Sequence, residues 1–113
     1  MSAITTHVLD TSRGGPAAGV GVVLERSTND TWSVVGRGDT DADGRQRSLM
    51  ADGAPVLAGR YRLTFDTQRY FEGLGVRSFF PAIAVTFETT DGESHYHVPL
   101  LLSPFGYSTY RGS

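Results

Sequence analysis

Alternation of apolar and polar residues runs through most segments of this 113-residue sequence, and this period of two constrains the fold more than any other feature. In residues 59–65, Tyr61, Leu63 and Phe65 share one parity and polar residues occupy the other. Successive side chains of a strand point to opposite faces, so each such segment predicts a strand with one buried face. The expected strands are residues 4–10, 19–27, 31–37, 59–65, 81–89, 95–102 and 107–111.

Turn signals separate several of these segments. Asn29-Asp30 predicts a tight turn before residues 31–37, and Asp91-Gly92 predicts a hairpin between residues 81–89 and 95–102. The Gly-rich and polar residues 11–18 and 38–47 are expected to be loops.

One segment, residues 67–74, breaks the alternation and reads as a short helix. Thr67 is its expected N-cap and Gly75 its C-terminal stop. The chain is therefore expected to be all-β: a single domain over residues 1–113, built as a two-sheet β-sandwich of about eight strands with one short helix.

Composition excludes several classes of function. The chain has no cysteine, which rules out thiol catalysis and Cys-ligated zinc. Its net charge is -2 and its charges are scattered, which argues against nucleic acid and against a polybasic membrane contact as partners. The longest apolar stretch, residues 98–102, is far shorter than the roughly 20 residues of a membrane-spanning helix. No signal peptide is visible, so a cytoplasmic location is the default expectation.

Three histidines are the first candidates for chemistry. His95 and His97 would point the same way from one strand, and with His7 they could hold a zinc ion that keeps a position open for water. The spacing alone is weak evidence, and packed or solvent-facing histidines without metal are the favoured interpretation. Residues 39–44 match the opening of a calcium loop, but Met50 stands where the bidentate Glu is needed. Neither a G-x-S-x-G elbow nor a phosphate-binding glycine motif is present.

Four segments together carry a resemblance to one family, and they occur in the family's order over nearly the whole chain. They are His7-Val8-Leu9-Asp10, Thr40-Asp41-Ala42-Asp43-Gly44-Arg45, His97-Val98-Pro99-Leu100-Leu101-Leu102-Ser103-Pro104 and Tyr110-Arg111-Gly112-Ser113. This combination resembles the transthyretin-related 5-hydroxyisourate hydrolases. The expected helix around Tyr70-Phe71 and the following Phe79-Phe80-Pro81 fit the same family.

The resemblance implies two four-stranded sheets and a homotetramer, a dimer of dimers, whose active sites lie in a channel between the dimers. It implies hydrolysis of 5-hydroxyisourate to 2-oxo-4-hydroxy-4-carboxy-5-ureidoimidazoline in urate breakdown, without metal or organic cofactor. Carried over by motif, the catalytic residues are His7, Arg45, His97 and Ser113. The substrate-binding residues are His7, Arg45, Tyr110, Arg111, Gly112 and Ser113.

These residue types suit the reaction, in which water attacks a ring carbonyl. A histidine titrates near working pH and can take the proton of the water, a task that His7 and His97 are expected to share. Arg45 is expected to bind and polarise the substrate, because its planar fork matches carbonyl edges. The tail is expected to shape the pocket, with Ser113 near the substrate. Which histidine is the base stays open, as do two other readings: a transthyretin-type carrier of a small ligand and a zinc-dependent hydrolase.

Overall fold

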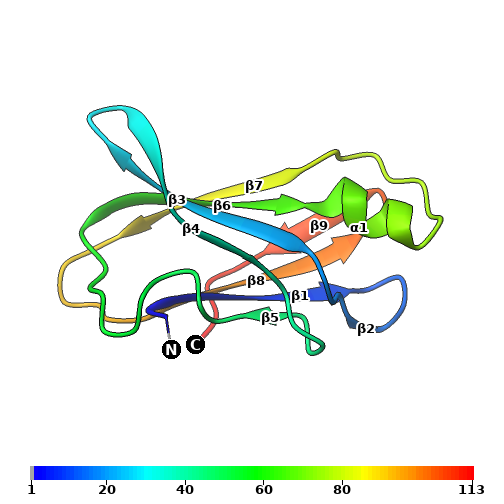
Figure 1. The fold of residues 1–113 in the computed structure, drawn as a ribbon, viewed down its shortest axis with the longest axis horizontal. Helices are drawn as coiled ribbons and strands as arrows, with labels where there is room; N and C mark the ends of the chain where they lie inside the picture. Colours follow the sequence, from blue (N-terminus) through cyan, green and yellow to red (C-terminus); the bar gives the residue numbers. More distant parts are fainter. Residues whose placement is uncertain (1) are drawn as a thin grey trace.

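The computed structural model describes residues 2–113 and shows two β-sheets packed face to face, with a short helix at one end (Figure 1). Its elements are β1 (Ile4–Asp10), β2 (Gly15–Pro16), β3 (Gly21–Thr28), β4 (Thr31–Asp39), β5 (Arg45–Gln46), β6 (Gly59–Asp66), α1 (Thr67–Gly73), β7 (Ile83–Thr89), β8 (Tyr96–Ser103) and β9 (Gly106–Thr109). The predicted sandwich is confirmed, and each expected strand begins and ends within one or two residues of its predicted bounds.

The first sheet has the order β2-β1-β8-β9, with β5 also paired to β1, and the second has the order β4-β3-β6-β7. The first sheet therefore has five strands instead of the four that the resemblance implied. The difference arises because β2 and β5, two residues each, form within segments expected to be loops. The pairing of β1 with β8 is parallel, from Ile4 beside Tyr96 to Asp10 beside Leu102.

The alternation predicts the core correctly in β1 and β6, whereas β4, also expected to bury one face, has no buried residue. Ile4, Thr6 and Val8 of β1 are fully buried, and the same holds for alternate residues of β6. Buried apolar side chains from both sheets form one cluster. Its largest fully buried members are Tyr61, Phe65, Phe71, Ile4, Leu24, Leu63, Ile83, Leu100 and Leu102. The opposite face of β1, which carries Thr5 and His7, points away from this cluster.

The two predicted turns have different outcomes. Asn29 and Asp30 both have positive φ (51° and 62°), as a two-residue hairpin turn between β3 and β4 requires. The hairpin predicted at Asp91-Gly92 is wrong. Here β7 pairs with β6 in the second sheet, whereas β8 pairs with β1 in the first, so the connection crosses between the sheets. The local turn signal is present, with φ of 90° at Gly92, but it does not determine which strands pair.

Helix α1 is confirmed, although its N-cap is Asp66 and not Thr67. The Asp66 carboxylate accepts a hydrogen bond from the Arg69 N–H at 3.3 Å, whereas the buried Thr67 hydroxyl donates to the carbonyl of Phe80 at 3.2 Å. Gly75 ends the helix as predicted, with φ of 69° and its N–H bonded to the Glu72 carbonyl at 3.0 Å. Among residues 2–113, no helix is long and apolar enough to cross a membrane.

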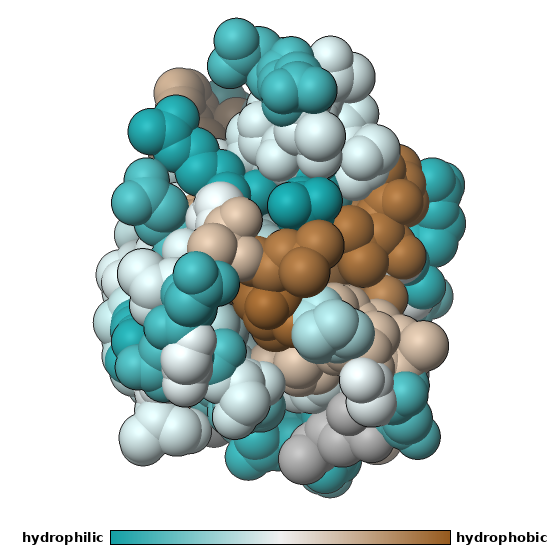
Figure 2. Space-filling model, turned by 90° about the vertical axis from the view of Figure 1, so that its left-hand side faces the viewer, coloured by the Kyte–Doolittle hydropathy of each residue, from teal (hydrophilic) through white to brown (hydrophobic). Residues whose placement is uncertain are grey.

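The end of the sandwich opposite α1 carries an apolar patch bordered by polar side chains (Figure 2). Leu57, in the loop before β6, is about half exposed. A hollow of about 580 Å³ lies between residues 2–3 and the loops at residues 53–56 and 92–95. His95 lies in its wall, outside β8, which begins at Tyr96.

Candidate active site

The outer face of the first sheet carries the predicted histidines and Arg45. In the strand register His97 of β8 lies beside Thr5 of β1, and Arg45 of β5 lies beside His7 of β1. Residues opposite each other in neighbouring strands point to the same face of the sheet. Thr5 and His7 alternate with the core residues of β1, so their side chains point away from the core. Strand pairing therefore gathers His7, Arg45 and His97 from three strands on one surface.

A hollow of about 210 Å³ opens on this surface. Its lining residues are Thr5, Thr6, Arg45, Arg47, His95, His97 and Ser113. Three predicted catalytic residues, Arg45, His97 and Ser113, thus share one hollow. His7 does not line it, but it lies beside Arg45 in the register and its charge acts on His97.

His97 is the half-buried histidine of the hollow. Its Nδ1 lies 2.8 Å from the hydroxyl oxygen of Thr5, so Nε2 is the nitrogen that can serve a bound molecule. Burial, followed by the charges of Arg45, His7 and His95, lowers the pKa of His97 from its ordinary value of 6.5. The ring is therefore neutral at neutral pH and able to accept a proton.

His7 is held differently. Its Nε2 lies 2.8 Å from the backbone carbonyl oxygen of Asp43. A carbonyl only accepts, so Nε2 of His7 carries the proton and Nδ1 is the basic nitrogen when the ring is neutral. One histidine thus tethers the loop that precedes Arg45, while the other faces the hollow.

The Asp41 carboxylate organises that loop. Its Oδ1 accepts hydrogen bonds from the N–H groups of Asp43 and Arg45, both at 2.9 Å. The bond from Arg45 is the main cause of the lowered pKa of Asp41. Gly44 closes the turn with φ of 77°, and a Cβ there would lie 2.3 Å from the carbonyl oxygen of Val8. The position requires glycine, and the tight turn places Arg45 directly against β1.

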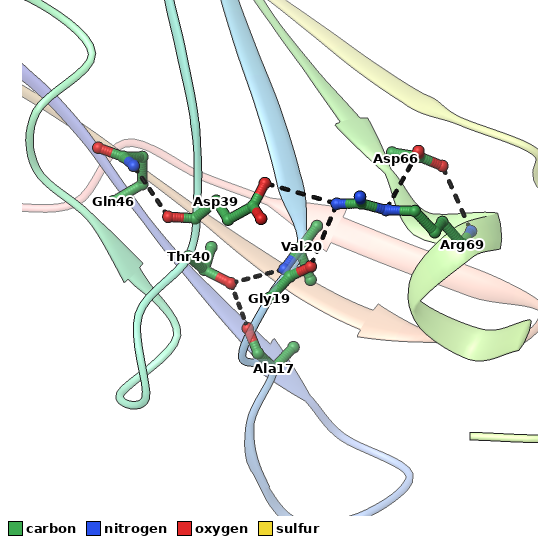
Figure 3. Close-up of polar contacts among 8 residues, drawn as sticks. All are labelled: Ala17, Gly19, Val20, Asp39, Thr40, Gln46, Asp66 and Arg69. Carbon is green, nitrogen blue, oxygen red and sulfur yellow. Dashed lines mark hydrogen bonds and ion pairs between the residues drawn. The ribbon is translucent and has the colours of Figure 1, made fainter. Parts of the chain in front are cut away.

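A polar network ties the start of this loop to the rest of the fold (Figure 3). The buried Thr40 hydroxyl donates to the carbonyl of Ala17 at 2.7 Å and accepts from the Val20 N–H at 2.9 Å. The Gln46 side chain donates to the carbonyl of Asp39 at 2.9 Å. Arg69 of α1 reaches the Asp39 carboxylate at 3.4 Å across exposed surface. Because exposed ion pairs contribute little, the Thr40 bonds are the main anchor of the loop.

The chain tail contributes unevenly to the site. The Gly112 N–H donates to the carbonyl of His97 at 2.8 Å, and Ser113 lines the hollow. Arg111 instead pairs with Glu93 at 3.4 Å and lies 4.8 Å above the ring of Tyr96. Tyr110 is 56 % exposed. Within one protomer, the two predicted substrate-binding residues Tyr110 and Arg111 therefore lie outside the hollow.

The zinc reading finds no ligand set in the part of the chain that the structure describes. No group of three or more His, Asp or Glu side chains in residues 2–113 is arranged to hold a metal ion. His95 lies outside the strand that was expected to align it with His97.

Four residues of the site were missed by sequence reasoning: Thr5, Thr6, Arg47 and Asp41. Thr5 carried a usable signal, since it lies two residues from His7 in an expected strand and so shares its face, whereas Arg47 lies in a segment expected to be a loop. Asp41 lay inside the quoted motif, but its role depends on the conformation of the turn, which the sequence pattern does not show.

Comparison with known proteins places the chain in a family. Residues 4–112 match the model of the HIUase/Transthyretin family, and the chain belongs to this family. A 5-hydroxyisourate hydrolase of Salmonella typhimurium is 47 % identical over 110 residues, which are 97 % of this chain and 80 % of that protein.

Solved structures show the same relationship. The 5-hydroxyisourate hydrolase of Klebsiella pneumoniae has a TM-score of 0.85 and 40 % identity, covering 99 % of this chain and 100 % of that one. Sea bream transthyretin, solved in complex with thyroxine, has a TM-score of 0.88 and 34 % identity, covering 97 % of this chain and 94 % of that one. The fold is thus shared by enzymes and a thyroxine-binding protein, and the choice between these functions depends on the site.

Proposed function

We propose that this chain hydrolyses 5-hydroxyisourate to 2-oxo-4-hydroxy-4-carboxy-5-ureidoimidazoline in urate breakdown, without a cofactor. The observation that carries the proposal is the hollow that brings Arg45, His97 and Ser113 together in a chain 47 % identical to a 5-hydroxyisourate hydrolase. A neutral histidine beside a guanidinium is the minimum that hydrolysis of a ring amide requires: a proton acceptor and a stabiliser of negative charge.

The proposed reaction is addition of water to a ring carbonyl. The water oxygen bonds to the carbonyl carbon, the carbonyl oxygen takes up negative charge, and the carbon–nitrogen bond of the ring then breaks. One proton of the water passes to a histidine and from there to the departing ring nitrogen. No covalent bond to the protein forms, which suits a chain without cysteine.

His97 is the favoured base of the two histidines. His97 lines the hollow, Thr5 engages its Nδ1 and leaves Nε2 free of that contact, and its pKa is lowered, so the ring is available in the basic form at neutral pH. His7 has its Nε2 engaged with the carbonyl of Asp43 and supports the loop that carries Arg45. Arg45 then stabilises the oxyanion, and the Ser113 hydroxyl contacts the substrate ring.

A homotetramer, arranged as a dimer of dimers, is the proposed assembly. On one protomer the hollow is small and open, and β7 and β9 end their sheets as unpaired edges within the described residues. Exposed aromatic side chains border the β9 edge, among them Phe105 and Tyr107, which are 64 % and 44 % exposed. A second copy would cover these groups and deepen the site, and light scattering in solution measures the mass that tests this. We also propose that residues 1–113 form one domain, since both sheets share one core.

The test of the activity is the ultraviolet absorbance decay of 5-hydroxyisourate, made freshly from urate by urate oxidase. We expect the protein to accelerate this decay above the spontaneous rate, with no effect of a chelator. His97→Ala should lower kcat at least about 100-fold, the range for loss of a general base, while circular dichroism stays unchanged. No acceleration by a folded protein would refute the proposal, and loss of activity on chelation would favour a metal-dependent reaction.

The alternative is a carrier of a small ligand, favoured by the TM-score of 0.88 with sea bream transthyretin in complex with thyroxine. Against it stands the lining of the hollow, where two arginines and two histidines offer polar contacts for a small acceptor-rich ring. Thyroxine titrated into the protein, followed by calorimetry, separates the two readings. Tight binding of thyroxine without turnover would support the carrier.

A further inference from the structure

Arg47 lines the hollow although neither of the candidate catalytic tasks described above uses it. It lies two residues after Arg45 in an extended segment that runs along β1, which puts both guanidinium groups on the same face. Its backbone is fixed, because its carbonyl accepts a hydrogen bond from the Ser2 N–H at 2.8 Å. The backbone of Arg47 is thus held in place, and its side chain lies at the hollow.

The guanidinium of Arg47 forms an ion pair with the Asp41 carboxylate, 3.6 Å away. Oδ1 of Asp41 is fixed by the N–H groups of Asp43 and Arg45, which leaves Oδ2 to face Arg47. The side chains of both partners are about half exposed, and such a pair contributes little to stability. Its effect is on position, because an anchored carboxylate restricts where a long arginine side chain rests.

We propose that Arg47 is a second substrate-binding arginine and that Asp41 is the positioning residue that holds its guanidinium at the hollow. This inference rests on the proposed function and adds a residue to the same site. Asp41 would act on both arginines: through the backbone on Arg45 and through the ion pair on Arg47.

The chemistry of the substrate gives two arginines separate tasks. A flat two-ring molecule presents carbonyl oxygens and nitrogens on more than one edge, and the reaction leaves a carboxylate on the product. Side chains two residues apart in a strand start roughly 7 Å apart, so Arg45 and Arg47 reach different edges of one small ring system. Each guanidinium forms two parallel hydrogen bonds with such an edge. Arg45, whose charge lowers the pKa of His97, serves the edge at the reacting carbonyl, and Arg47 holds another edge.

Steady-state kinetics of Arg47→Gln, Asp41→Asn and the double variant test the proposal. Arg47→Gln should raise KM about tenfold while kcat stays within about threefold, since a charged hydrogen bond to the bound ring is lost in ground and transition state alike. Asp41→Asn keeps an oxygen for the two backbone N–H groups and removes only the charge that holds Arg47. It should raise KM about threefold, and the double variant should match Arg47→Gln.

Two further variants sharpen the test. Arg47→Lys should recover part of the affinity, because it restores the charge without the fork. Arg60→Gln is the control: Arg60 forms a more exposed pair with Glu88 at 3.3 Å on the second sheet, and its loss should leave KM unchanged. Wild-type KM in Arg47→Gln would overturn the proposal. Fully multiplying effects in the double variant would overturn the role of Asp41.

Binding of urate, a ring-intact probe that the enzyme does not open, separates this inference from the proposed function. The Kd for urate should rise about tenfold in Arg47→Gln and remain unchanged in Arg60→Gln. A wild-type protein that binds urate through Arg47 without hydrolysing 5-hydroxyisourate would support the arginine site and refute the hydrolase. A wild-type protein that neither binds urate nor turns over substrate would overturn both.

Discussion

Gly112→Ala is the sharpest probe of how the tail controls the site. The Gly112 N–H is bonded to the carbonyl of His97. A Cβ added at residue 112 would lie 2.7 Å from Cδ2 of His97 and 3.2 Å from Cγ of Pro99. Such a distance to carbon is well inside van der Waals contact, for which the optimum is about 3.5 to 4.0 Å. The ring of His97 must therefore move by roughly 0.8 to 1.3 Å, or the tail must move away from it.

Either response should damage catalysis. A ring displaced by about 1 Å loses the Thr5 contact at Nδ1 and misplaces Nε2, and an error of this size costs roughly 100-fold in rate. If the tail moves instead, one backbone hydrogen bond is lost, worth about 1 kcal/mol, and Ser113 leaves the hollow. The expected result is a kcat about 100-fold lower with a free energy of unfolding within about 1 to 2 kcal/mol of wild type.

The assay is 5-hydroxyisourate decay for kcat and urea unfolding for stability. Gly73→Ala is the control, since a Cβ at that position meets nothing within 4 Å. It should keep full activity. A Gly112→Ala enzyme with wild-type kcat and an unchanged NMR signal from the His97 ring would show that the close approach of the tail does not determine the position of this side chain.

Three further predictions follow from the same geometry. Removing residues 110–113 should lower kcat at least about 100-fold yet preserve the circular dichroism spectrum, because β9 ends at Thr109. Arg45→Gln should raise the pKa of His97 in an NMR titration, because the charge of Arg45 lowers that pKa in the wild type. As the pH falls, the variant should therefore lose the neutral form of His97 at a higher pH than the wild type. An unchanged pKa would contradict this prediction. Tyr70→Phe removes a buried 2.8 Å hydrogen bond to the fully buried Asp10 carboxylate and should cost about 1 to 3 kcal/mol in urea unfolding; a smaller loss would show that the carboxylate finds another partner.

Most of the fold could be predicted because it depends on local patterns. Parity within each segment assigns a core face, and the observed burial of β1 and β6 follows it. The turn at Asn29-Asp30 joins strands that do pair, so its local signal was sufficient. At Asp91-Gly92 the same kind of signal failed, since strand pairing is decided by the sheets as a whole. The N-cap was placed one residue late because Asp66 and Thr67 are both good capping residues, and Thr67 is buried instead.

The site was predictable only where motif and strand parity agree. His7 and His97 lie on one surface because each falls at an outward position of a predicted strand, whereas Arg45 was identified by its motif alone, in a segment expected to be a loop. His95 was expected to align with His97, but the strand begins one residue later. The sequence pattern could not show which groups surround each side chain of the site. The Thr5 contact of His97 joins residues 92 positions apart, and the carboxylate of Asp41 acts through a folded turn.

The parallel pairing of β1 with β8 has a consequence for the order in which the protein is made. The second sheet consists of β3, β4, β6 and β7 and needs only residues 21–89. Strand β1, in contrast, cannot pair with β8 until residues about 92 positions further along the chain have been synthesised. At the pace of translation, 5 to 20 residues per second, that wait lasts roughly 5 to 20 seconds. Until then, β1 has emerged from the ribosome without the strand β8 with which it pairs. The hollow, which uses residues 5 to 113, can form only once Ser113 has been added, so a nascent chain can build its second sheet before its candidate active site.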